Sequence, residues 1–222
     1  MVRTLAHLGP GDRVLDLACG HGRHARVLAG RVGLVVGLDR SAAYLRRAQR
    51  EIAGAGAPPR YVRGDVRALP LREGSFDAVF SWYASLFMFD DATNEACLAE
   101  AARVVRRGGR LLVHHANPLR LAREPHATAR RLLPDGAAVE EESVYDPATG
   151  VDRCARRMAR GGEVVLAGIA ELRYYSPSEW RRLAPRAGLR LLELTTTFDA
   201  GSPARREPGP EAPDLIALLE KT

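Results

Sequence analysis

The fold of this chain is decided by the stretch Val14-Leu15-Asp16-Leu17-Ala18-Cys19-Gly20-His21-Gly22-Arg23-His24. It predicts a buried strand, an acidic residue near the strand end, a glycine loop and the start of a helix. Gly20 and Gly22 lack a Cβ atom, so the loop can turn sharply and a ligand can approach the main chain. Unpaired N–H groups at the start of the helix suit a carboxylate or a phosphate. We therefore expect a nucleotide-like cofactor at this loop.

Two classes of cofactor fit the loop. Gly20-x-Gly22-x-x-Ala25 matches the dinucleotide fingerprint, and Asp39 follows at about the spacing of the ribose-binding acid in that fingerprint. Asp16, however, lies just before the loop, where a carboxylate suits a cationic group better than a pyrophosphate because two nearby anions repel. The loop by itself leaves both classes open.

Two later segments favour the cationic cofactor. Gly64-Asp65-Val66 follows a strand-like run over 60–63, and Phe76–Tyr83 predicts a buried strand that ends in polar and aromatic residues. With the first motif and Asp39, these segments come in the order and spacing found in class I S-adenosylmethionine (SAM) dependent methyltransferases. The chain resembles that family closely from about residue 14 to 117 and more loosely to its end.

The resemblance implies a role for each motif residue. The loop Ala18–Gly22, with Asp16 behind it, would hold the methionine part of SAM. Asp39 would accept hydrogen bonds from both ribose hydroxyls, as a carboxylate with two oxygens can. Asp65 would accept one from the adenine amino group, and the Val66 backbone N–H would serve a ring nitrogen. Further cofactor contacts are expected from Arg40, Ser81 and Trp82.

Catalysis by such an enzyme requires orientation and exclusion of water more than a fixed motif. His114 and His115 are candidate general bases because they end the predicted fifth strand, 110–115, beside the expected methyl position. Neighbouring strand residues point to opposite faces, so at most one of them lines the pocket. A hydrogen-bonded histidine with no catalytic role is the alternative. Tyr83 is the third catalytic candidate, and the absence of a nearby acid argues against a metal.

The pattern of elements predicts an α/β fold, with a Rossmann-like, mostly parallel seven-stranded sheet and helices on both of its faces. Residues 1–118 would form the SAM-binding core, and residues 176–222 a helix and the last two strands of the sheet. Residues 119–175 would be inserted after the fifth strand, helical or irregular over 119–133 and then an antiparallel meander of three strands. Gly108-Gly109 is expected to end the helix before the fifth strand.

Composition narrows the class of protein further. The 222 residues suffice for one sizeable domain with an insertion. Without a membrane-length apolar run, a signal-peptide pattern or a cysteine framework among Cys19, Cys97 and Cys154, the chain is expected in the cytoplasm. The formal net charge is +6, but the basic residues are spread along the chain, so neither nucleic acid nor a membrane is expected as a partner.

The sequence therefore predicts a SAM-dependent methyltransferase that transfers a methyl group to N or O of a small molecule by in-line displacement, with S-adenosyl-L-homocysteine as product. An NAD(P)-dependent oxidoreductase and a non-catalytic SAM-binding protein are the alternatives. The run after Trp82 lacks the Asn/Asp-Pro-Pro-aromatic motif of nucleobase and amide N-methyltransferases. Only about a dozen residues precede Val14, so a cover for the cofactor is expected from the insertion or from a second subunit in a homodimer.

Overall fold

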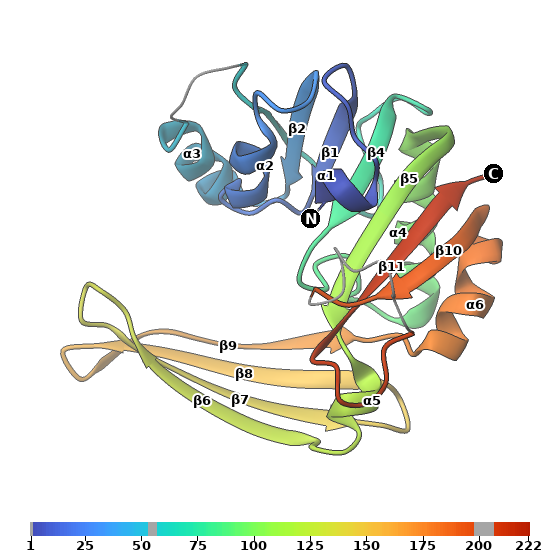
Figure 1. Ribbon diagram of the computed structural model, residues 1–222. Coiled ribbons are helices and arrows are strands. Elements are labelled where there is room, and N and C mark those ends of the chain that lie inside the picture. Colours follow the sequence, from blue (N-terminus) through green and yellow to red (C-terminus); the bar gives the residue numbers. More distant parts are fainter. Residues whose placement is uncertain (1, 53–56, 198–206) are drawn as a thin grey trace.

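The computed structural model describes residues 2–52, 57–197 and 207–222 (Figure 1). Within these residues, a seven-stranded sheet forms the core and a four-stranded sheet lies below it. The strands of the core sheet are β1 (Arg13–Leu17), β2 (Leu34–Asp39), β3 (Arg60–Arg63), β4 (Phe76–Ser81), β5 (Val105–Ala116), β10 (Leu189–Thr195) and β11 (Asp214–Lys221). The helices are α1 (Val2–Leu5), α2 (Arg23–Leu28), α3 (Ala42–Arg50), α4 (Asp91–Val104), α5 (Pro118–Leu121) and α6 (Pro177–Arg186).

The core sheet has the strand order β10-β11-β5-β4-β1-β2-β3. Neighbouring strands are parallel except for β11, which is antiparallel to both β5 and β10. From β1 the chain proceeds to β2 and β3 on one side and then returns to β4 and β5 on the other. The strand order thus reverses between β1 and β4, and ligands of such sheets bind at the carboxyl ends of the strands at this point. The predicted fold class is confirmed.

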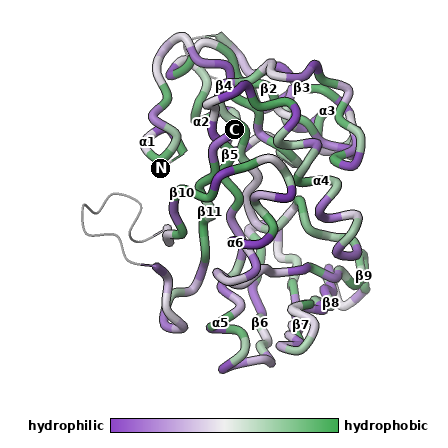
Figure 2. The backbone as a smooth tube through the Cα atoms, turned by 90° about the vertical axis from the view of Figure 1, so that its right-hand side faces the viewer, coloured by the Kyte–Doolittle hydropathy of each residue, from purple (hydrophilic) through white to green (hydrophobic). Residues whose placement is uncertain are grey.

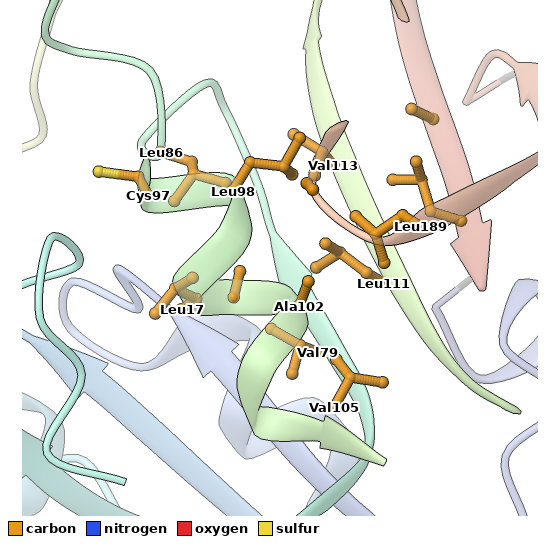
Figure 3. Packing of buried hydrophobic residues seen from close by; sticks show 14 of the residues in the cluster. Leu17, Val79, Leu86, Cys97, Leu98, Ala102, Val105, Leu111, Val113 and Leu189 are labelled. Carbon is orange, nitrogen blue, oxygen red and sulfur yellow. The ribbon is translucent and has the colours of Figure 1, made fainter. Parts of the chain in front are cut away.

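The alternation of side chains along the strands divides the core into two layers. Leu15 and Val79 face the side covered by α4 and α6, whereas Val14 and Phe80 face the side covered by α1 and α2. Figure 3 shows the first layer, in which Leu98 and Ala102 of α4 pack against strand residues such as Leu111. Both faces of the central strands are therefore buried, as expected for a parallel sheet.

The glycine pair Gly108-Gly109 lies inside a strand, so the prediction that it ends the preceding helix was wrong. Helix α4 ends at Val104 and β5 begins at Val105, which pairs with Phe76 of β4. The register then shifts, because the next pair joins Ala78 to Arg110. The glycines lie in this irregular stretch, where a Cβ on Gly109 would lie 2.7 Å from the Asp77 carbonyl oxygen. They allow a close backbone approach rather than a helix end.

The insertion contains four strands rather than three. They are β6 (His126–Leu132), β7 (Ala138–Asp146), β8 (Val151–Arg160) and β9 (Glu163–Arg173), joined in sequence order as an antiparallel sheet. The sequence analysis predicted helical or irregular structure for the segment that forms β6. Every residue of β6 is exposed, so no periodic hydrophobic signal marks it as a strand. Its backbone pairing with β7 over seven residue pairs supplies the missing stabilisation, and Arg131 forms a diagonal ion pair with Glu141 of β7.

The four-stranded sheet extends sideways beneath the carboxyl ends of the core strands, as Figure 1 shows. In the view turned by 90°, strands β6–β9 again gather below the core, next to α5 (Figure 2). The contact between the two parts includes Ala84 of the core and Tyr145 and Tyr174 of the insertion. None of the helices in the described ranges is long and apolar enough to cross a membrane.

Candidate active site

Asp16 is a buried carboxylate at the carboxyl end of β1. Its side chain is 2% exposed, and its Oδ2 accepts a hydrogen bond of 3.1 Å from the Ala25 N–H in the first turn of α2. Burial, with a smaller contribution from the charge of Asp39, raises the pKa of Asp16 to about 7, although the Ala25 hydrogen bond opposes the shift. No ion pair with a cationic side chain of the described residues offsets this burial. The site therefore favours a cationic ligand group.

The glycine loop after β1 uses a left-handed backbone at three positions, Ala18 (φ 58°), Gly20 (φ 55°) and Gly22 (φ 74°). Gly22 is also constrained by packing, because a Cβ atom there would collide with the Tyr61 hydroxyl. The Tyr61 ring lies against Gly37 as well, where a Cβ would come within 2.8 Å of it. Tyr61 thus supports the loop from β3, and the sequence analysis missed it since no local pattern links the two segments.

Asp39 ties the end of β2 to the glycine loop. Its Oδ2 accepts from the Gly20 N–H at 2.8 Å and its Oδ1 from the Ser41 N–H at 2.8 Å. Each carboxylate oxygen has a second lone pair, so the group can still accept hydrogen bonds from a pair of ligand hydroxyls. Asp16 and Asp39 lie close enough for the charge of one to affect the pKa of the other. The structure thus brings together the two acidic motifs and the loop.

Asp65 lies beside the end of β2, because the Gly64 N–H donates to the Asp39 carbonyl oxygen at 3.1 Å. The Arg67 guanidinium donates to both carboxylate oxygens, with Nε–Oδ1 3.0 Å and Nη2–Oδ2 2.7 Å, and the Arg67 N–H donates to Oδ1. These hydrogen bonds lower the pKa of Asp65 to about 2, so the carboxylate is ionised at neutral pH. Val66, next in sequence, packs at the border of the core.

Two further candidates follow the central strands. The Ser81 hydroxyl at the end of β4 is fully buried and finds no hydrogen-bond partner among the residues that the structure describes. Such a group favours a ligand that supplies the missing partner. The carbonyl oxygen of Arg40, just past β2, accepts from Arg63 Nε at 3.1 Å, which joins the ends of β2 and β3.

The two histidines at the end of β5 have different surroundings. His114 is 5% exposed, stacks on Trp82 with ring centroids 4.8 Å apart, and lines the cleft described below. His115 is fully buried on the other face, where its Nε2 accepts from Trp180 Nε1–H at 2.9 Å and its Nδ1 lies 2.7 Å from the Ala116 carbonyl oxygen. Burial lowers the pKa of His115 to about 4. Both ring nitrogens of His115 are therefore engaged in the core.

A cleft of about 1000 Å³ opens between the core sheet and the four-stranded sheet. Its core side includes Trp82, Tyr83 and His114, and its other side includes Leu172 and Tyr174. The Tyr83 side chain is 59% exposed. The charged side chains that line the cleft are Arg3, Arg23, Arg31, Arg156 and Asp214. The cleft adjoins the carboxyl ends of β4 and β5 and is large enough for a small molecule.

Together these residues fit SAM. A buried acid without a cationic partner, Asp16, complements a charged methionine part, and the free lone pairs of Asp39 complement a ribose. The open cleft lies beside the carboxyl ends of β4 and β5, at the same edge of the core sheet. In the part of the chain that the structure describes, no three His, Cys, Asp or Glu side chains gather as a metal site.

A model of the methyltransferase domain family matches residues 14–109, which contain all of these acidic and glycine motifs. Residues 14–109 therefore form a methyltransferase domain. Among curated proteins, a demethylmenaquinone methyltransferase of Mycolicibacterium vanbaalenii is 39% identical to this chain over 111 residues, which cover 50% of this chain and 45% of that protein. An uncharacterised protein of Mycobacterium bovis is 37% identical over 117 residues, which cover 48% of this chain and 42% of that protein. The chain thus spans less than half the length of these relatives.

Solved methyltransferase structures resemble the whole chain. The CcbJ methyltransferase of Streptomyces caelestis has a TM-score of 0.82 and 25% identity, covering 99% of this chain and 87% of its own. The sugar N-methyltransferase KedS8 of a Streptoalloteichus species has a TM-score of 0.71 and 21% identity. The match covers 100% of this chain and 84% of KedS8. Because the likeness covers nearly the full chain, these methyltransferase folds include counterparts of the insertion.

Proposed function

We propose that this chain binds SAM and transfers its methyl group to a nitrogen or oxygen atom of a small molecule held in the cleft between the two sheets. The observation that carries the proposal is the position of three groups together where the strand order reverses. They are the buried Asp16, which has no cationic partner among the described residues, Asp39 and the glycine loop. When bound, SAM supplies an activated methyl group on a cationic sulfur. S-adenosyl-L-homocysteine would be the product.

The roles of the chain's own residues follow from their positions. Asp16 and the loop hold the methionine part, Asp39 holds the ribose, and Asp65 with Val66 receives the adenine. Asp65 is engaged by Arg67, yet its ionised oxygens retain lone pairs for an amino group.

The lining of the cleft indicates the kind of acceptor. Arg3, Arg23 and Arg31 form no ion pair with another described residue, whereas the one acidic residue in the lining, Asp214, is engaged by His114. The positive charge of Arg23, after burial, is a cause of the lowered pKa of His24, which is about 4. The cleft therefore suits an acceptor that combines an aromatic or apolar body with a carboxylate or phosphate. A positive surrounding also favours the neutral, nucleophilic form of an amine.

We further propose that the protein forms a homodimer through the four-stranded sheet. Val144 is 49% exposed and Ile169 is 57% exposed. The register places them on one face, since Val144 pairs with Arg153, and Ala155, two residues further along β8, pairs with Ile169. The same face also carries charged side chains, among them Glu140, Arg153 and Arg157. A second copy related by two-fold symmetry would bring apolar side chains against apolar ones and could pair these charges.

Calorimetry with SAM, S-adenosyl-L-homocysteine and NAD tests the proposed cofactor. We expect binding of the first two and none of NAD. Asp39→Asn removes one charged acceptor and is expected to weaken SAM binding by about ten- to hundred-fold. Asp135→Asn, a matched change beside the β6–β7 turn where the carboxylate pairs with Arg160, should leave the affinity unchanged.

Turnover is measured as release of S-adenosyl-L-homocysteine with a panel of amines and alcohols, each tested with and without a carboxylate. We expect the acidic members to react faster. Tight SAM binding without turnover across the panel would instead support a non-catalytic SAM-binding protein. Binding of NAD in place of SAM would contradict the proposed cofactor and with it the proposed methyl transfer.

A further inference from the structure

We infer that Asp214 and His114 form a positioning relay that fixes the strained turn at Tyr83 and Ala84, and that His114 is a positioning residue rather than the general base. The catalytic consequence of this relay rests on the proposed methyl transfer, whereas its geometry does not. The relay joins three segments that are far apart in the sequence: the end of β5, the start of β11 and the turn after β4.

The turn after β4 has an unusual backbone. Tyr83 and Ala84 both adopt the left-handed region, with φ of 61° and 57°, and neither is glycine. Non-glycine residues in this region are strained and persist only where the surroundings hold them. The strain lies where the Tyr83 ring enters the cleft, with the Arg23 guanidinium carbon 5.5 Å from the ring centroid.

His114 holds this turn through its side chain and its main chain. The Tyr83 N–H donates to His114 Nδ1 at 3.2 Å, and the Ala84 N–H donates to the His114 carbonyl oxygen at 2.9 Å. A backbone N–H can only donate, so Nδ1 must be the unprotonated nitrogen of a neutral ring. The ring proton therefore lies on Nε2, which faces Asp214 Oδ2 at 3.3 Å.

Asp214 is itself fixed from the other side by Thr197. The Thr197 N–H donates to Oδ1 at 2.9 Å and its hydroxyl to Oδ2 at 2.5 Å. Burial would raise the pKa of Asp214, but the hydrogen bonds from His114 and Thr197 outweigh burial and lower that pKa. An ionised Asp214 accepts from every group around it and so determines which nitrogen of His114 carries the proton.

This arrangement leaves His114 without a free nitrogen for a substrate proton. Its Nδ1 lone pair is used by Tyr83, its Nε2 proton is directed at Asp214, and one ring face is stacked on Trp82 with an interplanar angle of 7°. His114 therefore acts through the position of Tyr83. A misplacement of about 1 Å can reduce the rate of a catalysed reaction about a hundred-fold. We therefore expect the rate of methyl transfer to depend on the position of this turn.

Two substitutions of His114 separate the two ends of the relay. In His114→Asn the amide oxygen occupies the position of Nδ1 and can accept from the Tyr83 N–H. In His114→Gln the amide reaches toward Asp214 and leaves the Tyr83 N–H without an acceptor. We expect amide hydrogen exchange at Tyr83 to be about as slow in His114→Asn as in the wild type, and at least about ten-fold faster in His114→Gln.

Asp214→Asn tests the relay from its other end without touching His114. The Thr197 N–H keeps the amide oxygen at the position of Oδ1, so the NH₂ group faces Nε2. His114 must then accept at Nε2 and carry its proton on Nδ1, opposite the Tyr83 N–H. We expect the ¹⁵N chemical shifts of the ring to report this reversed tautomer, together with faster exchange at Tyr83. Asp135→Asn serves as the matched control and should change neither.

The wild-type tautomer, measured at mildly alkaline pH where a histidine ring is neutral, decides the inference even if a variant fails to fold. A proton on Nδ1, or equal exchange at Tyr83 in wild type and His114→Gln, would overturn it. These two measurements do not require turnover. A chain that binds no SAM would therefore contradict the proposed function but not the inferred contacts among Asp214, His114 and Tyr83. With an active enzyme, kcat should fall about a hundred-fold in His114→Gln and recover in His114→Asn, while affinity for S-adenosyl-L-homocysteine changes less.

Discussion

At the scale of single residues, Asp16 couples the stability of the fold to cofactor binding. Burial raises its pKa to about 7 from an ordinary value of 3.8. Between these two pH values the folded chain holds a proton that the unfolded chain has released, so this residue costs stability as the pH rises through that window. A cation bound beside Asp16 favours its ionised form, so binding and ionisation are linked.

The linkage predicts that SAM affinity increases with pH up to about 7 and then becomes constant, by as much as about ten-fold per pH unit. Calorimetry in two buffers of different ionisation enthalpy should show release of a proton on binding below about pH 7. In Asp16→Asn the proton release should vanish. An unchanged pH dependence in this variant would assign the titration to another group.

Asp39 and Gly22 both belong to the predicted cofactor-binding motifs, but the structure requires these two residues for different reasons. The Asp39 carboxylate organises the loop directly, through the N–H groups of Gly20 and Ser41. Gly22 is required by the Tyr61 hydroxyl that lies against it. A glycine in a binding motif can thus serve the packing of a neighbouring strand as well as the ligand.

At the scale of elements, helix α6 shows how a local cap supports a distant packing contact. Ser176 and Glu179 form a capping box in which each side chain accepts from the other's backbone N–H. The cap fixes the helix that carries Trp180, whose ring N–H donates to the buried His115 at the end of β5. The cap at the start of α6 therefore helps to position Trp180 against β5, the strand that carries both histidines.

Ser176→Ala is expected to lower the free energy of unfolding by about 1 kcal/mol, which corresponds to about 2–4 °C in Tm for a chain of this size. Differential scanning calorimetry provides the measurement. Ser178→Ala, on the exposed side of the same turn, removes the contact between the Ser178 and Ser176 hydroxyls but keeps both capping-box hydrogen bonds, and it should shift Tm by less. Equal shifts for the two variants would remove the cap as the explanation.

At the scale of the whole molecule, the two sheets carry different kinds of surface. The core sheet is covered by helices on both faces, whereas several exposed apolar side chains, including Leu132, Val144 and Ile169, lie on the four-stranded sheet. The same sheet contributes Leu172 to the cleft, and Tyr174, just past the end of β9, lines it as well. A dimer that covers the face with Val144 and Ile169 would therefore also stabilise the sheet that lines one side of the cleft.

The proposed homodimer predicts that light scattering coupled to gel filtration reports twice the mass of the chain. Ile169→Glu replaces an exposed apolar side chain of the proposed interface by a charge and should yield a monomer with an unchanged circular dichroism spectrum. Glu163→Gln, at the β8–β9 turn, is the control that alters charge without adding it to that face. A wild-type monomer at high concentration would refute the dimer.

The sequence by itself determined the order of the elements and the positions of the acidic and glycine motifs. These depend on local properties, namely the periodicity of buried strands and the turns that glycine permits, and a chain carries such properties residue by residue. It failed for β6, whose residues are all exposed and whose pairing with β7 alone makes it a strand.

Only the tertiary structure decided how the two histidines are used. Ile216 of β11 pairs with His114 across the sheet, which brings Asp214, at the start of the same strand, to a ring one hundred residues earlier in the sequence. The contact of Tyr61 with Gly22 likewise exists only once β3 lies beside β2. Side-chain partners of this kind depend on the register of paired strands, and no local pattern encodes that register.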